Sequence, residues 1–203
     1  MQIDKGGGAI VHMQLYLLRH GDAGKSLAAA KIRSVDQSGV DPTLTVRGRQ
    51  DIEITARSLK VLKLKFTVVI TSPLKRALQT AKITAKIMGA EKELSICNEL
   101  APEGDRLKLY HRLSSFSQES SVLIVGHEPY LTSLIYDMVL QKTKGRPVGS
   151  INLKKSGLAK IRVISLSPNA RGELRWLLTP RILRSLSDSS SKVSAIGTKQ
   201  KGK

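Results

Sequence analysis

The segment MQLYLLRHGD, residues 13–22, is a short apolar run that ends abruptly in Arg19-His20-Gly21-Asp22. Its residues Leu15–Leu18 do not alternate with polar ones, which is typical of a strand buried on both faces of a parallel sheet. The same arrangement occurs twice more, in VVITSPLKR (residues 68–76) and VLIVGHEP (residues 122–129). In all three segments a predicted buried strand runs directly into residues with charged or imidazole side chains.

The segments between these runs have the apolar spacing of amphipathic helices. Two apolar stripes are present, one formed by Ile52, Ala56, Leu59 and Leu62, the other by Leu74, Ala77, Leu78, Ala81, Ala85 and Met88. Thr45 or Thr43 can cap the first helix, and Gly89 is placed to end the second. Pro129 suits the first turn of a third helix, which we expect to run to about Gln141. Alternating strands and helices predict an α/β sandwich with a mainly parallel central sheet.

The second of the three buried strands is expected to begin at Phe66. The remaining apolar runs are expected to be further strands: Leu94–Cys97, Ile151–Leu153, Leu158–Ser165 and Leu174–Leu177. We expect one domain over residues 13–180. Residues 1–12 include three consecutive glycines and are expected to be a flexible extension, with Met13 resembling a natural start. The Ser- and Lys-rich residues 181–203 are expected to be a largely disordered tail.

The chain is strongly basic, with 34 Lys and Arg against 16 Asp and Glu and a formal net charge of +18. Residues 13–180 carry 27 basic against 14 acidic side chains, and residues 181–203 carry six against one. Such a field attracts anionic partners, among them phosphorylated proteins and nucleic acid. Because aromatic residues make up only 3% of the chain, too few for a base-stacking platform, nucleic acid is not the favoured partner.

Other features exclude several classes of protein. No apolar run approaches the length of a membrane span, so we expect no association with a membrane. The single cysteine, Cys97, cannot form an internal disulfide, and no Cys/His spacing resembles a zinc site. We therefore expect a protein of the reducing cytoplasm that needs no metal or other cofactor.

The three strand-end motifs carry residues suited to phosphoryl transfer. The carboxyl ends of parallel strands lie at one edge of a sheet, where ligand sites form, so Arg19, His20, Arg76 and His127 are expected to converge. An unprotonated imidazole is a good nucleophile at neutral pH, and two guanidinium groups can hold the oxygens of a phosphate. A second histidine can add a donor to those oxygens. Gly21 lets the backbone approach the ligand closely.

The segments LLRHGDAG, SPLKRALQTA and LIVGHEPYL resemble, in order and spacing, the three signatures of the histidine phosphatase superfamily, the phosphoglycerate mutase-like proteins. The short chain, the RHGDA form and the segment Leu44-Thr45-x-x-Gly48 are most similar to the SixA-type phosphohistidine phosphatases. The resemblance covers roughly residues 13–180 and implies a three-layer α/β/α fold. It also implies that His20 is the nucleophile and that Arg19, Arg76 and His127 form the phosphate pocket.

The residues do not identify a proton donor, and three carboxylates each have two possible roles. Phosphomonoesterases need a proton donor, whereas phosphohistidine releases a neutral imidazole once its ring is protonated. Glu128 is either an acid beside His127 or a carboxylate favoured by a helix N-terminus. Glu103 lies in a loop that can face the pocket but also suits a turn. Asp22 either orients the pocket or caps a turn.

Three functions fit these residues. The first is a phosphatase that hydrolyses phosphohistidine on a protein, such as a phosphotransfer domain or a histidine kinase, through phosphorylated His20. The second is a small-molecule phosphomonoesterase or mutase-like enzyme, which would require an acid. The third is a scaffold that binds anions or nucleic acid, for which the basic surface is the argument. No motif specifies the phosphorylated partner or an oligomeric state.

Overall fold

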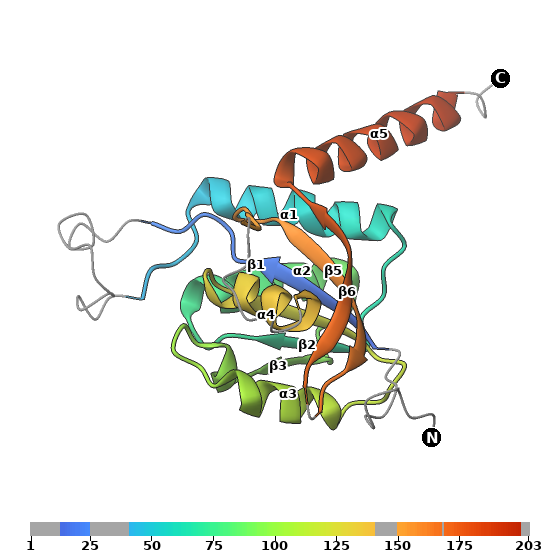
Figure 1. Ribbon diagram of the computed structural model, residues 1–203. Helices are drawn as coiled ribbons and strands as arrows, with labels where there is room; N and C mark the ends of the chain where they lie inside the picture. Colours follow the sequence, from blue (N-terminus) through green and yellow to red (C-terminus); the bar gives the residue numbers. More distant parts are fainter. Residues whose placement is uncertain (1–12, 25–40, 141–149, 168, 200–203) are drawn as a thin grey trace.

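The computed structural model describes residues 13–24, 41–140, 150–167 and 169–199. The expected extension at residues 1–12 therefore lies outside the described residues. The elements follow the chain in the order β1 (Gln14–Arg19), α1 (Val46–Val61), β2 (Val68–Thr71), α2 (Lys75–Met88), β3 (Leu94–Ile96), the 3-10 helix η1 (Asn98–Leu100), α3 (Arg106–Ser114), β4 (Ser121–Gly126), α4 (Tyr130–Val139), β5 (Leu158–Ser165), β6 (Arg171–Leu178) and α5 (Pro180–Lys199) (Figure 1).

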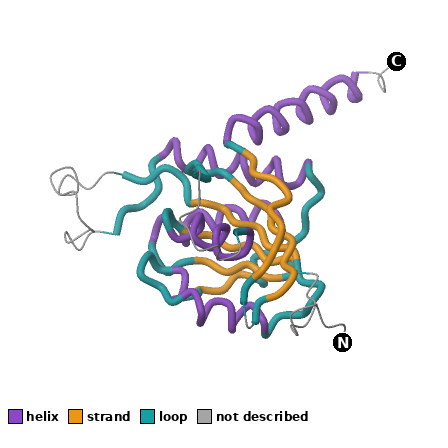
Figure 2. The backbone as a smooth tube through the Cα atoms, in the orientation of Figure 1, coloured by secondary structure: helices purple, strands orange, loops and turns teal. Residues whose placement is uncertain are grey.

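The strands form one six-stranded sheet in the order β3-β2-β4-β1-β5-β6 (Figure 2). The strands β3, β2, β4 and β1 are parallel to one another, whereas β5 is antiparallel to β1 and β6 is antiparallel to β5. The predicted α/β fold with a mainly parallel sheet is confirmed. The carboxyl ends of β1, β2 and β4, three adjacent strands at the centre, therefore meet at one edge.

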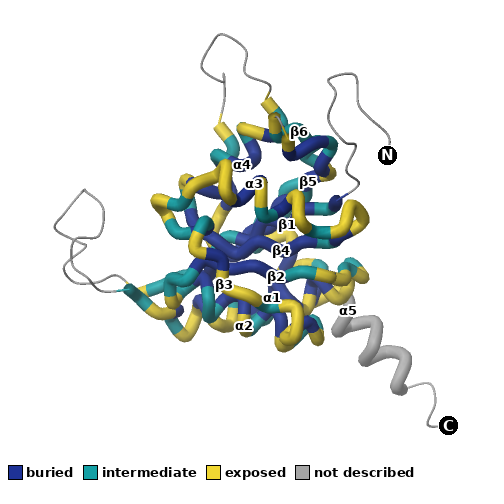
Figure 3. The backbone as a smooth tube through the Cα atoms, turned by 90° about the horizontal axis from the view of Figure 1, so that it is seen from below, coloured by how far each residue is buried: buried dark blue, intermediate teal, exposed yellow. Residues whose placement is uncertain are grey.

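The sheet separates two hydrophobic clusters, and successive residues of β1 alternate between them. Leu15 and Leu17 pack with residues of α3 and α4, whereas Tyr16 and Leu18 pack with residues of α1, α2 and α5. Figure 3 shows the buried central strands between these two helical layers. Burial on both faces explains why these strands are continuous apolar runs in the sequence.

The helix boundaries follow from local chemistry that the sequence indicates. Thr45 is the N-cap of α1, and its side chain accepts a hydrogen bond from the backbone N–H of Gly48 at 2.9 Å. Gly89 ends α2 in the left-handed conformation, with φ of 70°, which glycine adopts without steric cost. Helix α4 begins after Pro129 and ends at Val139, while the predicted end near Gln141 falls outside the described residues.

The predicted strand at Ile151–Leu153 is wrong, because these residues form no strand. Leu153 is buried, but its carbonyl accepts a hydrogen bond from the Arg19 guanidinium at 2.9 Å instead of joining the sheet. A side chain from a distant part of the chain therefore satisfies this backbone group. The second strand also begins at Val68 rather than at Phe66.

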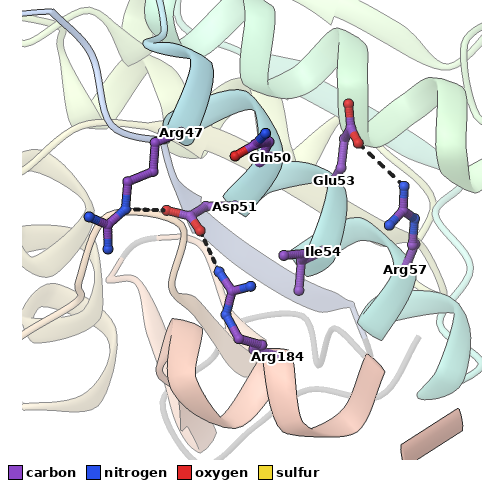
Figure 4. A pocket seen from close by; sticks show the side chains of 7 residues that line it. All are labelled: Arg47, Gln50, Asp51, Glu53, Ile54, Arg57 and Arg184. Carbon is purple, nitrogen blue, oxygen red and sulfur yellow. Dashed lines mark hydrogen bonds and ion pairs between the residues drawn. The ribbon is translucent and has the colours of Figure 1, made fainter. Parts of the chain in front are cut away.

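The expectation of a largely disordered tail from residue 181 is corrected, because Pro180–Lys199 form helix α5. Leu183 is fully buried in the cluster beneath α1, and its carbonyl accepts a hydrogen bond from the Ser58 hydroxyl. Arg184 binds Asp51 of α1 at 2.6 Å in the hollow drawn in Figure 4, where Arg57 also pairs with Glu53. The Ser- and Lys-rich composition of residues 181–203 gave no indication that Leu183 is buried against α1.

Candidate active site

His20 and His127 lie side by side at the carboxyl edge of the sheet. Arg19, the last residue of β1, is in register with Gly126, the last residue of β4, so each strand delivers a histidine one position later. The centroids of the two imidazole rings are 5.0 Å apart. Both side chains are buried, with 7% of His20 and 2% of His127 exposed. This burial requires that hydrogen bonds or a ligand satisfy the ring nitrogens.

The His20 ring is oriented by the backbone of the next residue. Its Nδ1 lies 2.7 Å from the carbonyl oxygen of Gly21. Because a carbonyl only accepts, Nδ1 carries the proton, and the lone pair of the neutral ring is then on Nε2. Burial, together with the charges of Arg76, Arg19 and Lys155, lowers the pKa of His20 to about 4, against the opposing hydrogen bond to Gly21. The ring is therefore neutral at physiological pH, with Nε2 available as a nucleophile.

His127 has the opposite arrangement of its ring nitrogens. Its Nε2 lies 2.8 Å from the hydroxyl of Ser72, which directly follows β2. Its Nδ1 is buried and has no hydrogen-bond partner among the described residues. Burial and the neighbouring charges, Arg76 first, lower the pKa of His127 to about 3, so this ring is also neutral. If the Ser72 hydroxyl donates to Nε2, the unpartnered Nδ1 carries a proton that an anion can accept.

Two guanidinium groups accompany the histidines. Arg19 donates from Nη1 to the carbonyl of Leu153, while its Nε is buried without a partner among the described residues. Arg76, in the first turn of α2, lies 3.5 Å from Asp41, which also accepts the backbone N–H of Lys75 at 2.6 Å. Both arginines are near enough to the two histidines for their charges to lower the pKa of both rings. An oxyanion beside the histidines would find donors already in position.

The loop after β1 is packed tightly against the start of α1. The carbonyl of Asp22 accepts the backbone N–H of Thr45 at 3.0 Å, and the Asp22 carboxylate accepts the Thr45 hydroxyl at 3.2 Å. A Cβ atom at Gly48 would lie only 2.0 Å from the carbonyl oxygen of Asp22. The segment Leu44-Thr45-x-x-Gly48 therefore holds the loop that carries His20.

Replacing Gly48 with alanine is expected to lower the free energy of unfolding by about 1–3 kcal/mol, since the new methyl group would force two backbones apart. The matched control is Gly24→Ala, because nothing lies within 4 Å of a Cβ at Gly24. Urea denaturation of both variants checks this expectation. A Gly48→Ala midpoint equal to that of Gly24→Ala would show that the loop relaxes freely.

The three carboxylates named from the sequence differ in their surroundings. A hydrogen bond from Lys155 is the main reason why the pKa of Asp22 lies below its ordinary value, so Asp22 is ionised and has no proton to donate. Glu128 has one buried carboxylate oxygen without a partner. Glu103 is exposed in a turn, and among the described residues neither glutamate forms a hydrogen bond or ion pair with the four pocket residues. Of these three carboxylates, Asp22 is therefore the one that helps to hold the loop after His20, through its hydrogen bonds with Thr45 and Lys155.

Several residues that support the site were not singled out in the sequence. Ser72 contacts His127, Asp41 contacts Arg76, and the hydroxyl of Thr80 accepts the backbone N–H of Gly21 at 3.1 Å. Ser72 lies within a motif that drew attention only to Arg76. Asp41 and Thr80 carry no local signal, since their roles depend on contacts that span 35 and 59 positions.

Within the described residues, no group of three or more His, Cys, Asp and Glu side chains is arranged to hold a metal ion. In the same part of the chain, every helix is too short or too polar to cross a membrane.

The protein has an α/β fold with two histidines side by side at one edge of its sheet, an arrangement suited to binding a phosphate, and comparisons with known proteins agree. The chain is 30% identical over 176 residues to an uncharacterised protein of Picosynechococcus, a match that covers 84% of this chain and 99% of that one. It is 25% identical over 170 residues to phosphohistidine phosphatase SixA of Escherichia coli strain K12, covering 83% and 94% of the two chains. The family model of the histidine phosphatase superfamily (branch 1) matches residues 15–101.

Solved structures share the fold. The protein histidine phosphatase SixA complexed with tungstate superimposes with a TM-score of 0.67 at 24% identity, covering 84% of this chain and 99% of that one. Phosphoserine phosphatase of Entamoeba histolytica in complex with phosphoserine gives 0.61 at 17% identity, covering 84% and 99%. The chain belongs to the histidine phosphatase superfamily, branch 1. It is a phosphatase of that superfamily.

Proposed function

We propose that this protein hydrolyses phosphohistidine on other proteins through a covalent phospho-His20 intermediate. The observation that carries the proposal is the neutral His20 ring, whose Nδ1 is bound to the carbonyl of Gly21 so that Nε2 holds the lone pair. Nε2 attacks phosphorus, the P–N bond of the substrate breaks, and its electron pair returns to the substrate imidazole, which leaves neutral once its other nitrogen is protonated. Water then attacks the phosphorus of phospho-His20, the P–Nε2 bond breaks with its electron pair returning to Nε2, and the protons of the water leave with inorganic phosphate.

The donors around His20 match the charge of the transferred group. The phosphoryl oxygens would accept hydrogen bonds from the unpartnered Nε of Arg19, from Arg76 and from Nδ1 of His127. None of these donors has to be protonated during the reaction, because the guanidinium groups are always charged and the neutral His127 ring carries its proton on Nδ1 when the Ser72 hydroxyl donates to Nε2. Donors that are in place before the reaction stabilise developing charge without reorganisation.

The surroundings of the carboxylates support phosphohistidine as the substrate. The pKa of Asp22 lies below its ordinary value because of the hydrogen bond from Lys155 first, and also because of the hydrogen bond from Thr45 and the charge of Arg47, so Asp22 is poorly suited to serve as an acid. An alkoxide leaving group requires a proton donor, whereas a protonated phosphohistidine ring leaves as neutral imidazole. The likeness to SixA of Escherichia coli and the positive charge of the chain also agree with an acidic phosphoprotein substrate.

One observation favours a small phosphate monoester instead. Glu128 directly follows His127 and has a buried carboxylate oxygen without a partner among the described residues. If that carboxyl group is protonated when substrate binds, it would supply the acid that an ester requires.

A substrate comparison separates the two functions. Phosphate release would be measured from a histidine-phosphorylated phosphotransfer domain, from phosphoserine and from p-nitrophenyl phosphate, with His20→Ala as the blank. We expect kcat/KM to be at least about 100-fold higher for phosphohistidine than for phosphoserine, because the serine alkoxide needs a proton donor and the protonated imidazole does not. p-Nitrophenolate also leaves without an acid, so p-nitrophenyl phosphate reports on the nucleophile alone. Faster release from a monoester, lost in Glu128→Gln, would replace the phosphohistidine proposal with the second function.

A further inference from the structure

We infer that Lys155 is a further substrate-binding residue of this pocket, which pairs with Asp22 beside His20 and binds the phosphoryl oxygens when substrate enters. The inference rests on the proposed function, because it adds a cationic group to the same phosphate pocket. Lys155 lies in the turn before β5, outside the three motifs that identify the family. Its ammonium group is 2.7 Å from Oδ1 of Asp22, two residues after His20.

The turn that carries Lys155 is bound directly to the catalytic segment. The backbone N–H of Ser156 donates to the carbonyl of Arg19 at 3.1 Å and to that of His20 at 3.2 Å. The backbone N–H of Arg19 donates in turn to the carbonyl of Gly157 at 3.1 Å. Lys155 is therefore placed by the same hydrogen bonds that place the nucleophile, unlike a lysine on an independent surface loop.

The turn itself has a defined conformation. Ser156 has a φ of 60°, and its carbonyl accepts the hydroxyl of Thr55 in α1 at 3.2 Å. The backbone N–H of Gly157 donates to the carbonyl of Lys154 at 2.8 Å, and a Cβ atom at Gly157 would lie 2.8 Å from that oxygen. These contacts restrict the direction in which the Lys155 side chain leaves the backbone.

The charge of Lys155 acts on the pocket. It is one of three cations, with Arg76 and Arg19, whose positive charge lowers the pKa of His20. The pair with Asp22 is half-exposed, with 45% of the Lys155 side chain and 43% of the Asp22 side chain accessible. Exposed ion pairs contribute little, so a doubly charged phosphoryl group can take the ammonium from a single carboxylate.

Asp22 is suited to hold the lysine without following it. Its second carboxylate oxygen accepts the Thr45 hydroxyl at 3.2 Å, and its backbone carbonyl accepts the Thr45 N–H. The carboxylate therefore stays bound to Thr45 when Lys155 moves to the phosphate. Asp22 is therefore a positioning residue for Lys155. This role is more specific than the two that the sequence left open, which were to orient the pocket or to cap a turn.

The test uses tungstate, a tetrahedral oxyanion, as the probe and isothermal titration calorimetry of the full chain as the readout. We expect Lys155→Met to weaken tungstate binding by about five- to tenfold, as the loss of one partly exposed charge-assisted hydrogen bond requires. The matched control is Lys154→Met. Lys154 is exposed and adjacent, its side chain has no hydrogen bond or ion pair within the described residues, and it is not among the cations that lower the pKa of His20. Its substitution should change the Kd by less than about twofold.

Asp22→Asn gives a second, independent measurement. It removes the competing carboxylate and leaves the lysine in place, so tungstate should bind as tightly as to the native chain or more tightly. Equal binding by Lys155→Met and the native chain, or a loss in Asp22→Asn as large as in Lys155→Met, would overturn the inference. Failure of the native chain itself to bind tungstate would overturn the phosphate pocket, and with it the proposed function, so the two failures are distinguishable.

Discussion

His20→Ala is expected to reduce kcat/KM for phosphohistidine at least about 10⁴-fold, the scale on which removal of a catalytic nucleophile acts. The methyl group cannot form the phosphoryl-enzyme bond, and the remaining arginines can only bind the substrate. The ring is 7% exposed and packs beside His127, so the variant also leaves a small void at the edge of the sheet. Steady-state phosphate release measures the loss of turnover, and circular dichroism shows whether the variant is folded.

The control for this prediction is His111→Ala, since His111 is exposed on α3 and is not among the groups that perturb His20 or His127. Its rate should stay within about twofold of the native rate, as for most surface substitutions. Brief reaction with labelled substrate should also leave an alkali-stable, acid-labile phosphate on the native chain but not on His20→Ala. Retention of that label by the variant would assign the covalent intermediate to another residue.

The second large effect is a loss of stability in acid. The pKa of His20 lies at about 4 and that of His127 at about 3 in the folded protein, whereas an unfolded histidine has its ordinary value near 6.5. The unfolded chain therefore binds more protons below pH 6.5, and stability falls as the pH is lowered from 6.5 toward 4. At pH 5 each histidine is expected to cost about 2 kcal/mol of the free energy of unfolding.

Urea denaturation at pH 7 and at pH 5 measures this loss, and the double variant His20→Asn/His127→Asn is the control. Asparagine side chains do not titrate, so the difference in free energy of unfolding between the two pH values should shrink by about 4 kcal/mol in the double variant. Inorganic phosphate at pH 5 should restore part of the native stability, because an anion in the pocket favours protonated imidazole. An unchanged pH dependence in the double variant would show that other groups control acid unfolding.

The structure shows where several of the cations of this basic chain are placed. Some cations are engaged in the fold, as Arg184 is with Asp51 and Arg162 is with Glu173. Lys155 and Arg76 also pair with carboxylates, those of Asp22 and Asp41, but their charges lower the pKa of His20 as well. Net charge alone therefore does not distinguish cations that bind an anion from cations that hold a helix in place. The position of each cation in the structure does.

The sequence by itself determined the class of fold and the chemistry of the strand ends. Uninterrupted apolar runs such as Val122–Val125 can be stable only when both faces of the strand are covered, and that condition implies helices on both sides of the sheet. Residues placed directly after parallel strands meet at one edge, so the sequence predicts that His20 and His127 lie together although 107 positions separate them in the chain, and their rings are indeed 5.0 Å apart. Caps such as Thr45 and Gly89 are local signals and were likewise readable.

Only the tertiary structure decided the residues that complete the site. The contacts of Arg19 with Leu153, of Arg76 with Asp41 and of Lys155 with Asp22 span 134, 35 and 133 positions. No periodicity or motif encodes such pairs, because each depends on how two separately predicted segments are brought together by burial of the sheet. The tail was misjudged for the same reason: its polar composition suggested disorder, whereas the burial of Leu183 beneath α1 is a property of the folded surface.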